Sequence, residues 1–93
     1  MSEKQAVHIM VHGYVQGVGF RYFTQTNATR FNISGWVRNN YDGTVEIWGE
    51  GDKLRLDQFV AAVRRGPSHS QVDKLDITWH PPEDTHHTFS IRY

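Results

Sequence analysis

The sequence passes from a strand pattern to a helix pattern within residues 7–31, VHIMVHGYVQGVGFRYFTQTNATRF. Val7, Ile9 and Val11 alternate with other residue types, which predicts a strand with one strongly apolar face. Apolar residues then recur at helical spacing, which predicts a helix over about residues 21–31. The glycine-rich segment between the two is therefore a strand-to-helix connection.

The rest of the chain continues to alternate between strand and helix patterns. It predicts, in order, a strand over 34–40, a hairpin turn at Asn40-Tyr41-Asp42-Gly43, a returning strand over 44–49, a helix that Asp52 caps and Gly66-Pro67 ends, and strands over 72–79 and 88–93. This is the order of the split βαβ, ferredoxin-like arrangement. We therefore predict an α+β sandwich in which two helices cover one face of an antiparallel sheet.

Composition restricts the class of protein. The chain has 93 residues, enough for one domain, and we expect residues 1–93 to form it. Hydrophobic residues are 38% and charged residues 22%, typical of a soluble globular domain. Ten basic and ten acidic residues give no net charge, which argues against general nucleic-acid binding. Because cysteine is absent, disulfides, thiolate nucleophiles and cysteine zinc sites are excluded.

The sequence shows neither a secretion signal nor a membrane span. No apolar segment follows the first five residues, and no apolar run approaches the ~20 residues that a span needs. We therefore expect a cytoplasmic protein without a membrane partner. Nothing in the sequence demands an oligomer, so we expect a monomer.

The connection Gly13–Arg21 has the composition of an anion-binding loop. Its three glycines permit positive φ angles, which turn successive backbone N–H groups inward around an anion. The following helix adds the positive end of its dipole, and Arg21 adds a planar guanidinium that matches phosphate oxygens. It is neither a Rossmann fingerprint nor a Walker A loop. These features alone leave open an ordinary glycine-rich connection with a surface arginine.

Two stretches carry further information about function. The first is Gly13–Arg21, and the second comprises Gly35-Trp36-Val37-Arg38-Asn39, Asp42-Gly43-Thr44-Val45, Gly49 and Gly51. Together they resemble the signatures of the acylphosphatase family, and Gly13–Arg21 is similar, position by position, to that family's Gly-x-Val-Gln-Gly-Val-x-Phe-Arg. The element order and the closing residues 89–93 extend the resemblance over nearly the whole chain.

The resemblance implies hydrolysis of a small-molecule acyl phosphate to a carboxylate and inorganic phosphate, without a metal or cofactor. It implies two catalytic residues: Arg21 would hold the phosphate, and Asn39 would orient the attacking water. The phosphate would also be bound by loop backbone amides, those of Tyr14, Val15, Gln16, Gly17, Val18, Gly19 and Phe20. The sequence indicates no pocket for the acyl group.

Two other function classes remain as alternatives. Domains of this kind also occur within carbamoyl-transfer enzymes, so the chain could be a non-catalytic module that binds an anion or carbamoyl phosphate. Trp36 and Trp48, on the expected helix-free face of the sheet, could instead stack RNA bases. Against RNA binding, the RNP1-like residues 17–23 open a helix here, and the net charge is zero.

Six histidines suggest metal binding or nucleophile activation, but their spacing does not favour either. His8 and His12 share a strand face without a thiol or carboxylate set at ligand spacing. His80, His86 and His87 flank an expected exposed loop, where a weak adventitious metal site is the most we predict. Ser68, His69 and Ser70 are neighbours in sequence, which is not the geometry of a nucleophile and its base.

Overall fold

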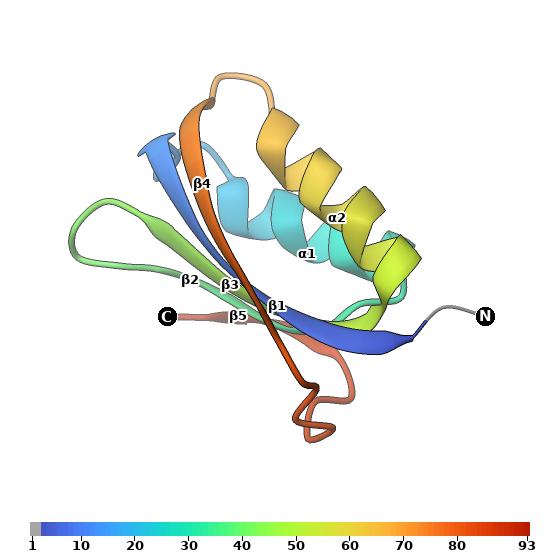
Figure 1. Ribbon diagram of the computed structural model, residues 1–93. Helices are drawn as coiled ribbons and strands as arrows, with labels where there is room; N and C mark the ends of the chain where they lie inside the picture. Colours follow the sequence, from blue (N-terminus) through green and yellow to red (C-terminus); the bar gives the residue numbers. More distant parts are fainter. Residues whose placement is uncertain (1–2) are drawn as a thin grey trace.

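The computed structural model describes residues 3–93 and confirms the predicted element order (Figure 1). The elements are β1 (Lys4–Tyr14), α1 (Phe20–Arg30), β2 (Ser34–Asn39), β3 (Val45–Asp52), α2 (Lys53–Arg65), β4 (Gln71–His80) and β5 (Phe89–Arg92). As predicted, Asp52 caps α2: its carboxylate accepts a hydrogen bond of 3.0 Å from the Leu54 amide. β1 is longer than predicted because it pairs along its length with β3 and β4.

The five strands form one sheet in the order β4-β1-β3-β2-β5. The first four pair antiparallel, as predicted, but β5 pairs parallel to β2, so the prediction of a wholly antiparallel sheet is wrong at this edge. The reason is the short crossing made by residues 81–88, which keeps the chain at the end of the sheet where β4 finishes (Figure 1). A strand that starts there must run opposite to β4, and β2 already has that direction.

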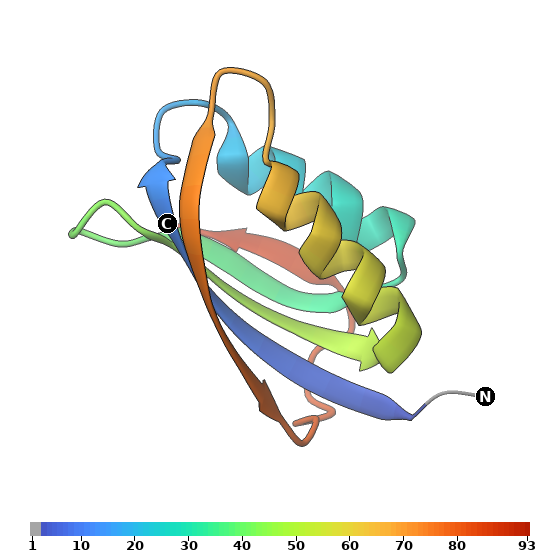
Figure 2. The same cartoon turned by 45° about the horizontal axis from the view of Figure 1, so that its top comes forward.

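Both helices cover one face of the sheet, as predicted (Figures 1 and 2). The core between the layers contains Val7, Ile9, Val11, Val37, Val45 and Ile47 from the strands and Phe20, Leu56, Phe59 and Val63 from the helices. The other face carries the alternate residues, and Trp36 pairs there with Trp48. In residues 3–93, neither helix combines the length and apolarity needed to cross a membrane.

Replacing Gly35 by alanine is expected to destabilise this sheet strongly. Gly35 has φ +138°, and a Cβ atom there would lie 1.9 Å from the carbonyl oxygen of Trp48 on the neighbouring strand. Overpacking typically costs about 1–3 kcal/mol, and backbone strain adds to it. Gly43→Ala is the control, because its φ is +92° but its Cβ would meet no atom within 4 Å. Equal shifts of the urea midpoint in the two variants would show that contact with Trp48 is unimportant.

Candidate active site

The connection between β1 and α1 has the backbone of an anion-binding loop. Gly17 and Gly19 have φ angles of +75° and +77°, in the left-handed region that glycine favours. A Cβ at either position would meet nothing within 4 Å, so backbone conformation, not space, demands glycine. Gly19 is the N-cap of α1, has no side-chain cap bond, and is followed by no acidic residue in the first turn. The first N–H groups of α1 and its positive dipole end thus remain available to an anion.

A small cavity brings the two predicted catalytic residues together. It measures about 150 Å³ and lies where β2 and β5 end beside the start of α1. Its lining consists of Val15, Gly17, Gly19, Phe20, Arg21, Tyr22, Asn39, Ile91 and Tyr93. Three of the predicted loop residues do not line it: Tyr14 belongs to β1, Val18 packs on the core, and Gln16 points toward the hairpin after β2.

Arg21 brings a positive charge to the cavity. Its guanidinium carbon lies 4.7 Å from the centre of the Tyr93 ring, and the side chain is partly buried. Within residues 3–93 it makes no ion pair with an acidic side chain. Stacking on an aromatic ring restricts the plane of the guanidinium and leaves its N–H edges free for an anion.

Asn39 contributes a buried acceptor that the protein leaves unsatisfied. In the described part of the chain, its Oδ1 atom is buried and has no hydrogen-bond partner. Such an atom costs about 1–3 kcal/mol, so a ligand or water that donates to it is favoured. Because Asn39 also lines the cavity, that donor would lie beside an anion bound by the loop.

A hydrogen-bonded hairpin turn holds the end of β2. The Asp42 carboxylate accepts from the Thr44 backbone amide at 3.0 Å and from its hydroxyl at 2.6 Å. These bonds hold the pKa of Asp42 below its usual value. Asn40 Nδ2 in turn donates to Thr44 Oγ1 at 3.1 Å. The predicted turn is therefore confirmed, and it fixes the backbone directly after Asn39.

The structure adds two features that sequence reasoning missed. The side-chain amide of Gln16 donates to the carbonyl oxygens of Asn40 and Thr44, at 2.7 and 2.9 Å. A second, more open hollow of about 560 Å³ adjoins the cavity and shares Asn39 and Tyr93 with it. No local pattern could reveal either feature, because both join residues at least 22 positions apart.

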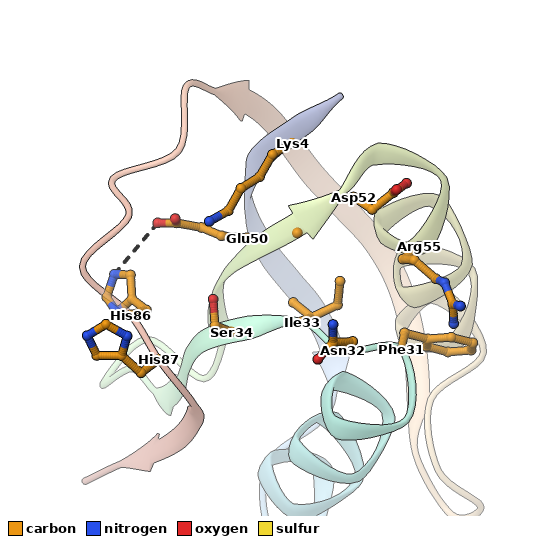
Figure 3. Close-up of a pocket in the computed structure, with 11 residues that line it drawn as sticks. Lys4, Phe31, Asn32, Ile33, Ser34, Glu50, Asp52, Arg55, His86 and His87 are labelled. Carbon is orange, nitrogen blue, oxygen red and sulfur yellow. Dashed lines mark ion pairs between the residues drawn. The ribbon is translucent and has the colours of Figure 1, made fainter. Parts of the chain in front are cut away.

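A larger hollow, of about 650 Å³, lies at the opposite end of the sheet, where β1 and β2 begin and β3 ends. Figure 3 shows the side chains that line it. Its most unusual residue is Glu50, whose side chain is 1% exposed. That carboxylate accepts from Trp48 Nε1 at 2.7 Å and from the backbone amides of Glu83 and Asp84 at 3.1 Å. His86 Nε2 lies 3.8 Å away. The protein itself thus satisfies this charge, and Glu50 acts as a clamp on the crossing segment 81–88.

His8 and His12 each pair with a different carboxylate. His8 pairs with Glu46 at 2.7 Å and His12 with Asp76 at 2.8 Å, so the two do not converge. Among residues 3–93, one group of possible metal ligands converges, formed by Glu50, Glu83 and His86, and its atoms are already paired. His80 and His87 do not join it. Ser68, His69 and Ser70 lie in the connection between α2 and β4, where the Ser70 hydroxyl donates to the Pro67 carbonyl.

Glu50→Gln is expected to reduce the free energy of unfolding by about 1–3 kcal/mol at neutral pH, because an amide N–H would then face the Trp48 donor. Burial alone would raise the pKa of Glu50, but hydrogen bonds from Trp48, Asp84 and Glu83 outweigh it, so the pKa lies below its usual value. The carboxylate's contribution is then complete above the unfolded-state pKa and is lost as the pH falls through the folded-state pKa.

The difference in free energy of unfolding between wild type and Glu50→Gln should therefore shrink as the pH falls below about 4.3, the ordinary pKa of glutamic acid. Urea titrations at a series of acidic pH values measure this difference. Glu83→Gln is the control, since this exposed side chain should contribute less than about 1 kcal/mol. A gap that stays constant through the acid range would show that the Glu50 charge does not stabilise the fold.

Comparisons with known proteins agree on one family. The chain matches the acylphosphatase family model over residues 7–91, which include all the cavity residues but Tyr93. It is 47% identical over 85 residues to an acylphosphatase of Bacillus subtilis strain 168, covering 91% of this chain and 93% of that protein. It is 48% identical over 77 residues to one of Chlorobaculum tepidum, with 83% of each chain covered. The crystal structure of acylphosphatase from Bacillus subtilis superposes with a TM-score of 0.93 at 45% identity, covering 96% of this chain and 99% of that chain.

Proposed function

The chain belongs to the acylphosphatase family, and from this premise we propose that it hydrolyses acyl phosphates to a carboxylate and inorganic phosphate, with Arg21 and Asn39 as its catalytic residues. One observation carries the residue assignment. Arg21, the uncapped start of α1 and the unpartnered Asn39 Oδ1 all meet in a single cavity of about 150 Å³. Binding an anion would require only Arg21 and the uncapped start of α1. Hydrolysis also requires a group that holds the attacking water, and the Asn39 Oδ1 atom can act as that group.

The phosphoryl group is bound by the positive end of the site. Arg21 donates two parallel hydrogen bonds to its oxygens, and the loop N–H groups together with the first N–H groups of α1 donate further ones. Phosphoryl transfer depends on positioning and on stabilising charge at these oxygens. Both sets of donors therefore lower the barrier without taking part in covalent chemistry.

The attacking water is held by Asn39. Its O–H donates to Asn39 Oδ1, which leaves an oxygen lone pair free to attack phosphorus. The new P–O bond forms as the bond to the acyl oxygen breaks, and the acyl group leaves as a carboxylate. The water's proton passes to a phosphate oxygen. Because a carboxylate is a good leaving group, this step needs no strong general base.

Release of inorganic phosphate from benzoyl phosphate, measured with EDTA present, tests the proposal. Activity that EDTA leaves unchanged supports metal-independent hydrolysis. Saturable phosphate binding without turnover would instead support the binding-module alternative. A salt-dependent shift of single-stranded RNA without hydrolysis would support the RNA alternative.

We also propose that residues 1–93 act as one domain, as a monomer in the cytoplasm and without a nucleic-acid partner. Arg21, Asn39 and the loop already meet within one chain, which supports a site that works in a monomer. The net charge of zero supports the absence of a nucleic-acid partner. Light scattering after size exclusion tests the monomer, and a mass near 10.8 kDa is expected.

A further inference from the structure

The two halves of the proposed site stand on strands that are not neighbours. The phosphate-binding loop follows β1, Asn39 ends β2, and β3 lies between these strands in the sheet. No backbone ladder therefore joins the loop directly to the end of β2. Hydrogen bonds between β1 and β2 therefore do not set the distance between a loop-bound phosphate and a water held by Asn39.

Gln16 spans this gap. Its Nε2 atom donates to the carbonyl oxygen of Asn40 at 2.7 Å and to that of Thr44 at 2.9 Å. Asn40 directly follows Asn39, and the Asn40 amide donates to the same Thr44 carbonyl at 2.9 Å. The partly buried Gln16 side chain thus ties the loop to the hairpin at the two carbonyls that close its first turn.

The chemistry of this contact requires an amide. Two hydrogen bonds leave one nitrogen toward two carbonyl oxygens, which the NH₂ group of glutamine can provide. A glutamate of the same shape would place a negative carboxylate against both carbonyls. A methionine would fill the space, but each of the two carbonyl oxygens would lose its hydrogen bond from residue 16.

We propose that Gln16 is a positioning residue, which sets the Asn39-bound water in line with the loop-bound phosphate. This inference rests on the proposed function and deepens it. Its side chain acts through the hairpin and does not touch the phosphate, since Gln16 is not among the residues that line the phosphate cavity. Its loss should therefore reduce turnover while leaving phosphate affinity nearly intact.

The test compares Gln16→Met and Gln16→Glu with wild type for kcat on benzoyl phosphate and for competitive inhibition by inorganic phosphate. We expect kcat to fall at least about tenfold, because small errors in position are costly in such reactions, and Ki for phosphate to change less than about threefold. The control is Gln25→Met, since Gln25 Nε2 likewise donates to a carbonyl, that of Phe89 at 3.2 Å, but ties α1 to β5. Its kcat should stay near wild type.

A readout without turnover separates this proposal from the proposed function. In wild type, inorganic phosphate should shift the NMR signals of the loop amides and of the Asn39 side-chain NH₂ group; in Gln16→Met it should shift the loop amides alone. If kcat of Gln16→Met stays within about threefold of wild type, or if phosphate still shifts the Asn39 signal in that variant, Gln16 does not position the site. An inactive wild type that nonetheless shows the NMR difference would overturn the hydrolase proposal and keep the Gln16 coupling.

Discussion

Asn39→Ala is expected to lower kcat for benzoyl phosphate by about 10²–10³-fold, the usual effect of removing one preorganised catalytic hydrogen-bonding group. Inorganic phosphate should still inhibit with a Ki within about threefold of wild type, because Arg21 and the loop amides are unchanged. The loss should thus appear in kcat, since Asn39 acts on the water and not on the phosphate.

The same variant should gain or keep stability while it loses activity. Within residues 3–93 the buried Asn39 Oδ1 atom accepts no hydrogen bond from the protein, so its removal breaks no hydrogen bond of the fold at that atom. The urea midpoint should therefore not fall. Asn27→Ala is the control with the opposite pattern: Asn27 Nδ2 donates to the Phe23 carbonyl in α1, away from the cavity. That variant should lose stability and keep kcat. An Asn39→Ala enzyme that turns over at a near-normal rate would remove Asn39 from the mechanism.

The sequence predicted those features of the fold that local patterns encode. The alternation around Ile9, the helical spacing after Arg21 and the Asp42-Gly43 turn each involve residues a few positions apart, and the structure confirms all three. The direction of β5 depends instead on which edge of the sheet the last strand joins. That choice depends on pairings with β2, about 54 positions away, and it has no local signature.

In the candidate site, too, the sequence predicted the features that local patterns encode and missed those that depend on distant residues. Local chemistry pointed to Arg21 and the loop, because glycine, a helix start and a guanidinium adjoin in sequence. Asn39 came only from the resemblance, since an asparagine at a strand end has no distinctive pattern. Glu50 was missed because strand alternation places it on the helix-free face, and the crossing segment 81–88, whose amides bind its carboxylate, lies more than 30 positions away.

Arg21→Lys is expected to lose at least about 10²-fold in kcat/KM, even though it keeps the positive charge. An ammonium is a point charge that cannot form two parallel hydrogen bonds with a phosphate, and it lacks the planar guanidinium that Arg21 places over the Tyr93 ring. Arg21→Gln, which also removes the charge, should be inactive. Unlike Asn39→Ala, both variants should raise the Ki for inorganic phosphate, because Arg21 binds the phosphoryl group itself.

Arg92→Lys is a closely matched control for this substitution. Its guanidinium carbon lies 4.7 Å from the centre of the Trp36 ring, the same separation as between Arg21 and Tyr93, but Arg92 does not line the cavity. If Arg21 acts by binding phosphate, Arg92→Lys should keep kcat/KM within about threefold of wild type while Arg21→Lys does not. Equal losses of kcat/KM in both variants would mean that stacking at the edge of the sheet, and not the phosphate contact, accounts for the effect. An Arg21→Lys enzyme with near-normal kcat/KM would show that a positive charge alone is sufficient for catalysis.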